Sequence, residues 1–224
     1  MRLHSANILT VMCSGVNDCT SRNRNFFGII TFRSRPMEEI LEHFKRTNAL
    51  LEGHFILSSG LHSPKYLQCA LALQQPQDAK HFGTAIAENF RSSEIETVAS
   101  PAIGGLIIGY AVAEALNVRF IWTERQDGLM TLRRGFSLRS GEKILVVEDV
   151  ITTGGSTREC IAALEQNGGK VVAAASIVDR SNGTADVGVP RISLVKLDIP
   201  AYEPGENCPM CESGDTPYKP GSRK

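Results

Sequence analysis

Apolar and polar residues alternate from residue 37 onward in blocks that predict strands separated by helices. The clearest strand covers residues 144–147, an unbroken aliphatic run that suits a strand buried on both faces of a parallel sheet. Apolar positions then recur at helical spacing from Thr157 to Leu164, and Gly168 with Gly169 provides a left-handed stop. This stretch therefore predicts a strand, a tight loop and the N-terminus of a helix.

Similar blocks fill the rest of the chain. Strands that alternate with helices require crossover connections, so the pattern predicts an α/β fold with a mainly parallel sheet flanked by helices. Ligands of such sheets bind at the carboxyl ends of the strands, and the loop after residue 147 lies at one of these ends. The other expected strands cover residues 55–60, 66–73, 97–100, 118–123, 170–178 and 191–197, and the other expected helices start at Met37 and cover 78–90 and 106–116.

The composition is that of a globular protein and gives no sign of binding to nucleic acid or membranes. The chain has 224 residues, 42% of them hydrophobic, which is ordinary for a globular protein of one large or two small domains. Lys+Arg and Asp+Glu are equal at 24 each, so no global field favours nucleic acid or an anionic membrane. No apolar run reaches membrane-spanning length. We expect a soluble protein with neither a nucleic-acid nor a membrane partner.

Residues 1–36 differ from the rest of the chain. They hold five arginines against one acid, Asp18, and show no persistent helical or strand period. An Arg- and Ser-rich, acid-poor leader can be an organellar transit peptide, but no cleavage signal is visible. We expect a disordered extension. A translation start assigned upstream of the true one would also produce such an extension, because Met37 opens the first expected helix.

The six cysteines predict a reducing compartment. Cys69 and Cys160 fall inside an expected strand and an expected helix, where reduced, buried thiols are usual, so we expect a cytoplasmic protein. Cys208 and Cys211 have the spacing of half a zinc site, but zinc normally takes four ligands and no second C-x-x-C is present. A plain tail with two thiols is favoured, and a structural zinc remains the alternative.

The loop after the buried strand carries candidate chemistry. A loop that opens a helix presents unpaired backbone N–H groups and the positive end of the helix dipole, which suits a phosphate. Gly154 and Gly155 allow the backbone to approach the anion, and four hydroxyl residues can add donors. These hydroxyl residues are Thr152, Thr153, Ser156 and Thr157.

Two acids, Glu148 and Asp149, directly precede this loop and would repel a phosphate unless they face another group. The hydroxyls of a ribose, or a Mg²⁺ shared with a second phosphate, would remove the conflict. Neither the Walker pattern nor the dinucleotide G-x-G-x-x-G pattern occurs. The loop therefore predicts a sugar-phosphate site, with an ordinary capped turn as the alternative.

The stretch "VVEDVITTGGST" resembles the phosphoribosyl diphosphate (PRPP) motif of type I phosphoribosyltransferases. Three further stretches, at 53–73, 123–136 and 176–183, resemble those of orotate phosphoribosyltransferases in order and separation. The likeness extends from about residue 37 to the C-terminus. It implies the type I phosphoribosyltransferase fold as a single domain over 37–224, with a small hood built from about 37–75 and the C-terminal segment.

The resemblance also implies an activity. Orotate and PRPP would give orotidine 5′-monophosphate and pyrophosphate in pyrimidine (UMP) synthesis, with Mg²⁺ carried by PRPP and no direct protein ligand assigned to it. Family members are usually homodimers in which a mobile loop of one subunit closes over the neighbour's site. The runner-up activity is purine salvage, and the alternative from another class is a regulator of the same fold that senses nucleotides and binds RNA.

Site residues follow from the resemblance. Glu148 and Asp149 would hold the ribose hydroxyls, directly or through the metal, and Arg125, in a loop, would swing onto the pyrophosphate unless it is a plain surface arginine. Arg180, with Thr152, would bind orotate, whose carboxylate matches a planar guanidinium; its alternative is an ion pair with Asp179 or Asp186. The expected PRPP contacts are Glu148, Asp149, Val150, Ile151, Thr152, Thr153, Gly154, Gly155 and Ser156.

The chain departs from the best-known members at several cationic positions. Those members carry lysines where this chain has Ser58, Gln126 and Leu129, and a loop histidine that is absent between residues 124 and 142. A branch of the family with the same "SSGLHS" and "TLRRGF" stretches resembles this chain more closely. The candidates to replace the missing cations are Lys65, His62, Arg133 and Arg134, while His54 and His62 could equally be structural histidines.

Overall fold

The computed structural model describes residues 35–57 and 60–220. The extension predicted for residues 1–36 lies outside the described residues except for its last two positions, and so does Ser58. Among the described helices, none combines the length and the apolar character that crossing a bilayer requires.

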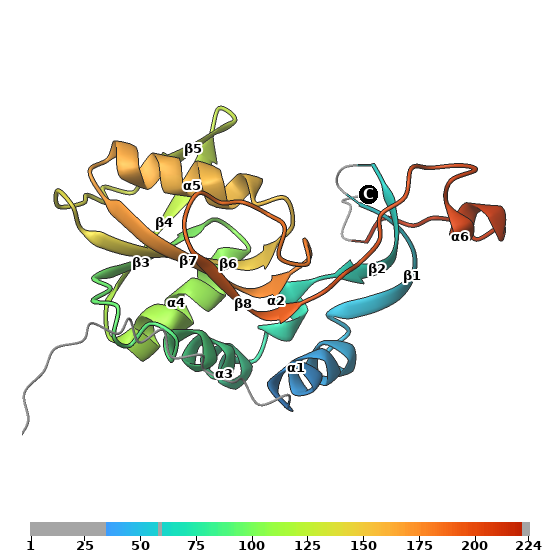
Figure 1. The fold of residues 1–224 in the computed structure, drawn as a ribbon, viewed down its shortest axis with the longest axis horizontal. Coiled ribbons are helices and arrows are strands. Elements are labelled where there is room, and N and C mark those ends of the chain that lie inside the picture. The colour runs from blue at the N-terminus through green and yellow to red at the C-terminus, as the bar shows by residue number, and fades with distance from the viewer. Residues whose placement is uncertain (1–34, 58–59, 221–224) are drawn as a thin grey trace, which may run out of the picture. The chain divides into compact units, whose positions relative to one another are not determined.

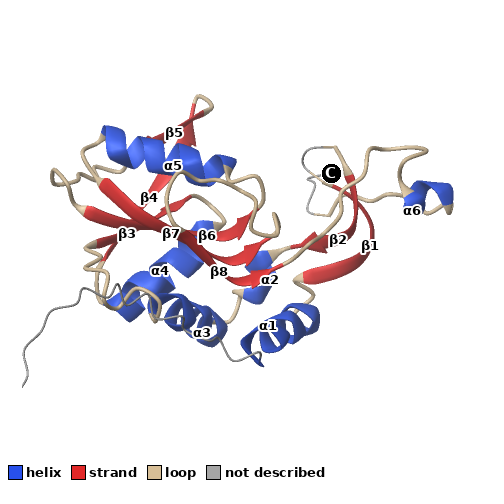
Figure 2. Ribbon diagram, viewed as in Figure 1, coloured by secondary structure: helices blue, strands red, loops and turns tan. Residues whose placement is uncertain are grey.

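The described strands form a hairpin and a central sheet (Figures 1 and 2). The hairpin is the antiparallel pair β1 (Leu50–Ile56) and β2 (His62–Leu67). The strands of the central sheet are β3 (Thr97–Pro101), β4 (Arg119–Gln126), β5 (Leu129–Leu132), β6 (Lys143–Ile151), β7 (Lys170–Asp179) and β8 (Arg191–Lys196).

The central sheet has the order β5-β4-β3-β6-β7-β8. All neighbouring pairs are parallel except β4 with β5, which is an antiparallel hairpin at one edge. The predicted α/β fold with a mainly parallel sheet is therefore confirmed. Because β6 lies between β3 and β7, its carboxyl end is surrounded by the loops that follow its neighbours.

Helices cover both faces of this sheet (Figure 1). α5 packs on one face, and α3 and α4 pack side by side on the other. Gly83 permits the close approach of α3 to α4, because a Cβ at this position would lie 2.6 Å from Ala111. The described helices are α1 (Arg35–Arg46), α2 (Cys69–Ala72), α3 (Pro76–Ala87), α4 (Gly105–Leu116), α5 (Gly155–Gln166) and α6 (Pro209–Glu212).

The aliphatic run of β6 anchors both layers. Leu145 and Val147 belong to the core beneath α3 and α4, whereas Ile144 and Val146 belong to the core beneath α5. All four are 0% exposed, as the unbroken apolar run predicted. Each fully buried aliphatic side chain contributes about 1.5–3 kcal/mol. This burial on both faces holds the end of β6 in a fixed position.

Three sequence predictions differ from the structure. The strand predicted at 55–60 begins earlier, as β1, because an irregular register around Gly53 hides its alternation. The strand predicted at 66–73, which contained Cys69, ends at Leu67, and Cys69 opens the short helix α2. The short edge strand β5 is missing from the predicted strands, because four residues with no clear alternation give little signal.

The hairpin β1–β2 also pairs with the C-terminal part of the chain. His62 and Tyr202 form an antiparallel bridge, and Phe55 and Tyr218 form a parallel one. In Figure 1 this segment, with α6, runs beside β1 and β2. The predicted division into a hood and a single domain over 37–224 stays a prediction.

Candidate functional site

The two adjacent acids at the end of β6 face opposite sides of the sheet, as neighbouring residues of a strand must. Glu148 turns toward α5 and accepts a hydrogen bond from the Thr157 hydroxyl. Asp149 turns toward the turn that precedes α4, where a Cβ on Gly104 would lie 2.6 Å from its Oδ1 atom. Glycine at position 104 therefore leaves room for the Asp149 carboxyl group.

Both acids are partly buried and short of hydrogen-bond donors. Burial raises the pKa of Glu148 to about 7, against the lowering effect of the Thr157 hydrogen bond, and the nearby Asp149 raises it further. Burial also raises the pKa of Asp149, although the backbone N–H of Val150 donates to its Oδ1 atom at 2.9 Å. Ribose hydroxyls or a divalent cation would supply the missing partners.

The raised pKa of Glu148 predicts that the free energy of unfolding of the chain depends on pH, and that Glu148→Gln abolishes this contribution. The group titrates at about 7 in the folded chain and near 4.5 when unfolded, so between these values the folded state holds more protons. The free energy of unfolding therefore falls as pH rises through this window, by on the order of 3 kcal/mol in total. Urea unfolding from pH 5 to 8 should show Glu148→Gln gaining stability relative to the parent, whereas a constant difference would contradict the assignment.

The loop after β6 has the geometry of an anion site. Gly154 has φ 75°, and a Cβ there would lie 2.8 Å from Val187 Cγ1, so a larger residue would strain the turn. α5 begins at Gly155 without a side-chain cap. The N–H groups of its first turn are thus available to a phosphate, and Thr152 and Thr153 are exposed beside them.

Arg158 braces this loop and was not identified from the sequence. Its Nη1 donates to the carbonyl of Thr153 at 2.9 Å and to that of Asp186 at 2.5 Å. The side chain therefore ties the loop after β6 to the loop before β8. An arginine on an exposed helical face gives no sequence signal for such a contact.

Arg180 follows β7 and lies beside the end of β6. Its backbone N–H donates to the Ile151 carbonyl at 2.8 Å, which places it one strand away from the two acids. Its Nε atom is buried and, within the described residues, makes no hydrogen bond. Burial lowers the pKa of the Arg180 guanidinium, with Tyr66 and Cys69 acting in the opposite direction. A buried, unpaired guanidinium N–H calls for an acceptor from outside the chain.

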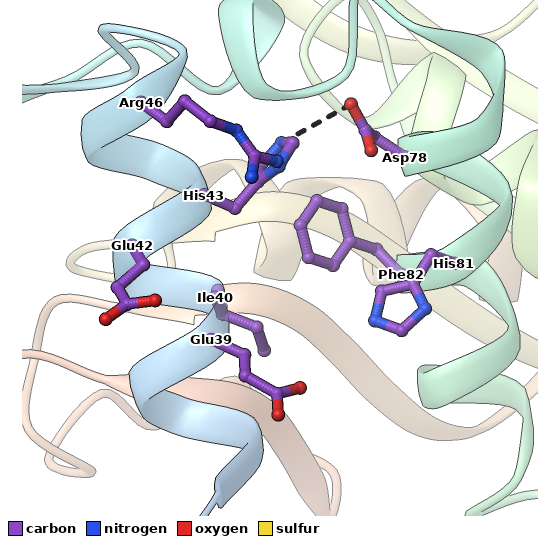
Figure 3. A pocket seen from close by; sticks show the side chains of 8 residues that line it. All are labelled: Glu39, Ile40, Glu42, His43, Arg46, Asp78, His81 and Phe82. Carbon is purple, nitrogen blue, oxygen red and sulfur yellow. Dashed lines mark hydrogen bonds and ion pairs between the residues drawn. The ribbon is translucent and has the colours of Figure 1, made fainter.

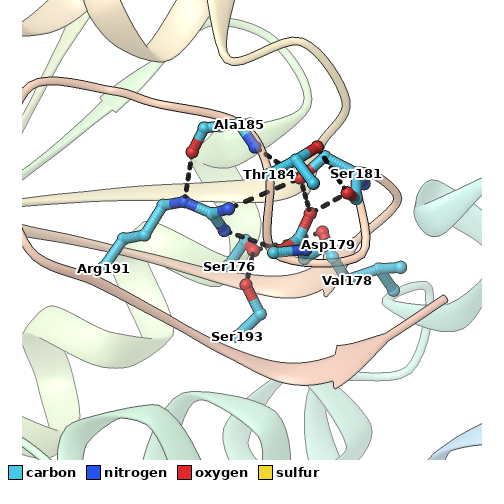
Figure 4. Close-up of polar contacts among 9 residues, drawn as sticks. Ser176, Val178, Asp179, Ser181, Thr184, Ala185, Arg191 and Ser193 are labelled. Atoms are coloured by element: carbon cyan, nitrogen blue, oxygen red, sulfur yellow. Dashed lines mark hydrogen bonds and ion pairs between the residues drawn. The ribbon is translucent and has the colours of Figure 1, made fainter. Parts of the chain in front are cut away.

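The alternative role of Arg180, an ion pair with a neighbouring aspartate, is not observed among the described residues. Asp179 is occupied by Arg191, whose Nη1 lies 2.7 Å from Oδ2, and by the hydroxyl of Ser181 at 2.6 Å (Figure 4). Burial opposes these contacts, but the hydrogen bonds from Ser181 and Arg191 prevail and lower the pKa of Asp179. The Asp179–Arg191 contact closes the loop at 180–185 and leaves Arg180 facing the cleft.

These elements enclose a cleft of about 640 Å³. It is open at the carboxyl ends of β6 and β7, as expected for a parallel sheet. The cleft brings together Asp149, Thr152, Thr153 and Arg180, but Glu148, Ser156 and Thr157 do not line it. Its lining residues are Leu57, Leu61, Tyr66, Leu67, Gln68, Cys69, Asp149, Val150, Thr152, Thr153, Arg180, Ile199 and Ala201.

Arg125 lies elsewhere, and its predicted loop position is wrong. It belongs to β4, where it pairs with Met130 of β5. Its Nη1 donates to the Gly128 carbonyl at 2.9 Å, and its Nη2 lies 2.5 Å from Glu159 on α5. The edge hairpin therefore holds Arg125 on the surface, away from the cleft residues of the same chain.

The other proposed cations also lie outside the cleft. Arg133 and Arg134 both pair with Glu124, and the hydrogen bond from Arg134 is the main reason that the pKa of Glu124 falls to about 2. Lys65 lies 3.5 Å from Glu52, with both side chains exposed. His62 is buried against the C-terminal segment. No replacement for the family's loop lysines is thus found among the described lining residues.

A second hollow, of about 340 Å³, lies between α1 and α3 (Figure 3). Its central side chain, His43, is satisfied internally: Nε2 lies 3.0 Å from the Ala72 carbonyl and Nδ1 lies 3.0 Å from Arg46 Nη2. Asp78 lies 3.7 Å from the same imidazole. None of its lining residues belongs to the motifs identified in the sequence, so the larger cleft is the better candidate site.

Comparison with known proteins agrees with the site. Residues 72–198 match the family described as phosphoribosyl transferase domain. The chain is 53% identical over 184 residues to an orotate phosphoribosyltransferase of Caldicellulosiruptor bescii, covering 82% of this chain and 96% of that protein. The crystal structure of orotate phosphoribosyltransferase from Aeropyrum pernix is similar with a TM-score of 0.60 and 26% identity, over 70% of this chain and 93% of that one.

The orotate phosphoribosyltransferase of Mycobacterium tuberculosis, crystallised in complex with PRPP, is also similar. Its TM-score is 0.58 at 25% identity, over 72% of this chain and 96% of that chain.

Proposed function

The chain belongs to the orotate phosphoribosyltransferase family, and from this premise we propose that it transfers the phosphoribosyl group of PRPP to orotate in pyrimidine nucleotide synthesis. The products are orotidine 5′-monophosphate and pyrophosphate. One observation supports the proposal: Asp149, two threonines of the loop and Arg180 line one cleft at the end of β6, and the buried Nε atom of Arg180 has no hydrogen bond within the described residues.

The chemistry of the transfer explains the arrangement. Breaking the bond between ribose C1 and the pyrophosphate oxygen builds positive charge on the sugar and negative charge on the leaving group. The loop at 152–156 binds the 5′-phosphate through its backbone N–H groups and hydroxyls. Asp149 binds the ribose hydroxyls from the opposite side of the cleft floor, and its negative charge stabilises the cationic ribose.

Mg²⁺ is expected with PRPP, and the residues present fit it. Oxygen ligands suit this ion, which commonly uses one or two carboxylates together with phosphate oxygens. Asp149 lines the cleft with an under-solvated carboxyl group and would hold the ion together with phosphate oxygens of PRPP. When bound, the ion neutralises charge on the leaving pyrophosphate.

Arg180 and Thr152 account for the choice of base. Orotate carries a carboxylate beside two ring carbonyls, and a planar guanidinium donates two parallel hydrogen bonds to such an edge. The Nε–H of Arg180, which makes no hydrogen bond to the part of the chain that the structure describes, could donate one of these two bonds. Adenine and hypoxanthine lack the carboxylate, so they would leave the buried guanidinium unpaired.

A spectrophotometric assay tests the proposal directly. The purified chain, supplied with PRPP and Mg²⁺, should consume orotate at least about 100-fold faster than it consumes adenine, hypoxanthine or uracil, because an unpaired buried charge costs about 3 kcal/mol or more. Faster use of a purine would replace the proposal with purine salvage.

The free thiols of Cys69 and Cys160 support a cytoplasmic location as a further part of the proposal.

We also propose that the protein acts as a homodimer with shared sites. Three exposed apolar side chains support this: Ile103 in the turn before α4 is 83% exposed, and Ile107 and Tyr110, three residues apart on α4, are 54% and 64% exposed. Large exposed apolar patches mark protein interfaces. Since Arg125 lies away from the cleft of its own chain, we assign it to the pyrophosphate in the second subunit's site.

Arg125→Ala should lower kcat by about 10- to 100-fold while leaving the Tm unchanged, because an exposed ion pair contributes about 1 kcal/mol or less. Steady-state kinetics and a thermal melt check both parts. Co-expression of Arg125→Ala with Asp149→Asn subunits should restore about a quarter of the parent rate, since half of the random dimers are mixed and each keeps one intact site. A mixture no more active than its components would contradict the sharing of sites.

A further inference from the structure

Four metal-ligating side chains meet away from the cleft. His54 on β1, His62 on β2 and the pair Cys208 and Cys211 at α6 place one ligand atom each within 4.8 Å of all the others. The two histidines and Cys208 are buried, and Cys211 is partly buried. Two distant parts of the chain thus contribute two ligands each to one point.

The distances approach those of a tetrahedral zinc site. His54 Nε2 lies 2.8 Å from His62 Nδ1, 3.7 Å from Cys208 Sγ and 3.8 Å from Cys211 Sγ. Cys211 Sγ lies 3.3 Å from His62 Nδ1. Zinc–nitrogen and zinc–sulfur bonds of ordinary length place tetrahedral ligands about 3.3–3.8 Å apart, so small shifts would accommodate the ion. The Cys₂His₂ set itself selects zinc over magnesium or calcium.

A second hydrogen bond orients one of the ligands. Nδ1 of His54 lies 2.8 Å from the Asp215 carbonyl, to which it can donate. Donation from Nδ1 leaves Nε2, the atom that lies within the cluster, with a free lone pair. Histidine ligands of zinc commonly donate their other N–H group to a carbonyl or carboxylate in this way.

The described C-terminal segment is mostly exposed. Of residues 200–220, only Cys208 and Pro220 are buried. The segment joins the hairpin through the bridges of Tyr202 to His62 and of Tyr218 to Phe55, but it adds almost no apolar core. Small units with insufficient core are commonly stabilised by a disulfide or a metal. The cysteines of this cluster are free, which leaves the metal as the cross-link.

We propose that His54, His62, Cys208 and Cys211 bind one structural Zn²⁺ that ties the C-terminal segment to the β1–β2 hairpin. The site also supports one wall of the cleft. His62 forms a β-bridge with Tyr202. The residues just before them in the chain, Leu61 and Ala201, both line the cleft. The metal therefore stabilises the substrate-binding surface without taking part in the transfer.

Metal analysis of the full chain tests the proposal independently of its activity. Protein purified without chelator and loaded with Zn²⁺ should hold one equivalent after dialysis. Protein loaded with Co²⁺ instead should show the visible absorption of tetrahedral cobalt together with thiolate charge-transfer bands. Stoichiometric Zn²⁺ on the parent chain supports the site even where variants fail to fold. Less than about 0.1 equivalent, with no tetrahedral Co²⁺ spectrum, would overturn it.

Variants locate the metal. Cys208→Ser and Cys211→Ser should lose the bound Zn²⁺, and Cys160→Ser, which alters a buried free thiol on α5, should retain it. Removing the metal from the parent chain should lower the Tm by about 10 °C or more and raise the KM for orotate more than it lowers kcat. Retention of Zn²⁺ by a double Cys208→Ser, Cys211→Ser variant would place the metal elsewhere and refute the assignment.

Discussion

Asp149→Asn is expected to lower kcat by about 1000-fold, because it removes the negative charge that the cleft directs at the ribose as positive charge develops there. The carboxyl group of Asp149 lies against Gly104 and lines the cleft. It can therefore contact the substrate and is not needed for packing of the core. Asparagine has nearly the same shape and can still accept the hydrogen bond from the Val150 N–H group. Folding should therefore survive the change.

Steady-state kinetics and a thermal melt separate the two effects. The Tm of Asp149→Asn should equal or exceed that of the parent, because burial raises the pKa of this carboxyl group and its ionised form is costly in the empty site. Glu165→Gln, an exposed acid on α5, serves as the matched control and should leave both quantities unchanged. Activity lost together with the cooperative transition would make Asp149 a structural residue.

Arg180→Ala should raise the KM for orotate by about 100-fold and that for PRPP by less than about threefold, since a charge-assisted pair in a buried site contributes about 3 kcal/mol. The Nε atom of Arg180 is buried and has no hydrogen-bond partner among the described residues, so truncation breaks no hydrogen bond of that atom. The Tm should rise or stay constant, because burial already disfavours the charged guanidinium.

Initial rates measured with each substrate varied in turn check this prediction. Arg180→Lys should recover only part of the orotate affinity, because an ammonium group lacks the planar pair of donors. Arg91→Ala, which breaks only an exposed ion pair with Glu88, is the control for loss of a surface arginine. Equal losses for orotate and PRPP would contradict the role of Arg180 in base recognition.

The parts of the molecule that follow from local pattern were predictable. The aliphatic run of β6 and the helical period of α5 are buried as expected, and the loop between them lies at the carboxyl end of a parallel strand. The convergence of Asp149 and Arg180 follows from the parallel order of β6 and β7. Strand alternation also implied that Glu148 and Asp149 face opposite sides of the sheet. Both acids were nevertheless assigned to the ribose hydroxyls from the sequence.

The parts that depend on distant pairing could not be derived. The position of Arg125 is set by a four-residue edge strand that pairs only with β4. Arg158 and Arg191 hold loops through contacts that no motif encodes. The C-x-x-C pair was recognised as half of a metal site, but its partners, His54 and His62, lie about 150 residues earlier and meet it only because the hairpin pairs with the C-terminal segment.

The most direct test of the central claim is a crystal structure with orotidine 5′-monophosphate bound. The account predicts the 5′-phosphate on the loop at 152–156, the ribose hydroxyls within hydrogen-bonding distance of Asp149, and the base carboxylate on the guanidinium of Arg180. A nucleotide bound elsewhere, with that loop free of phosphate and the carboxyl groups of Glu148 and Asp149 paired only within the protein, would contradict it.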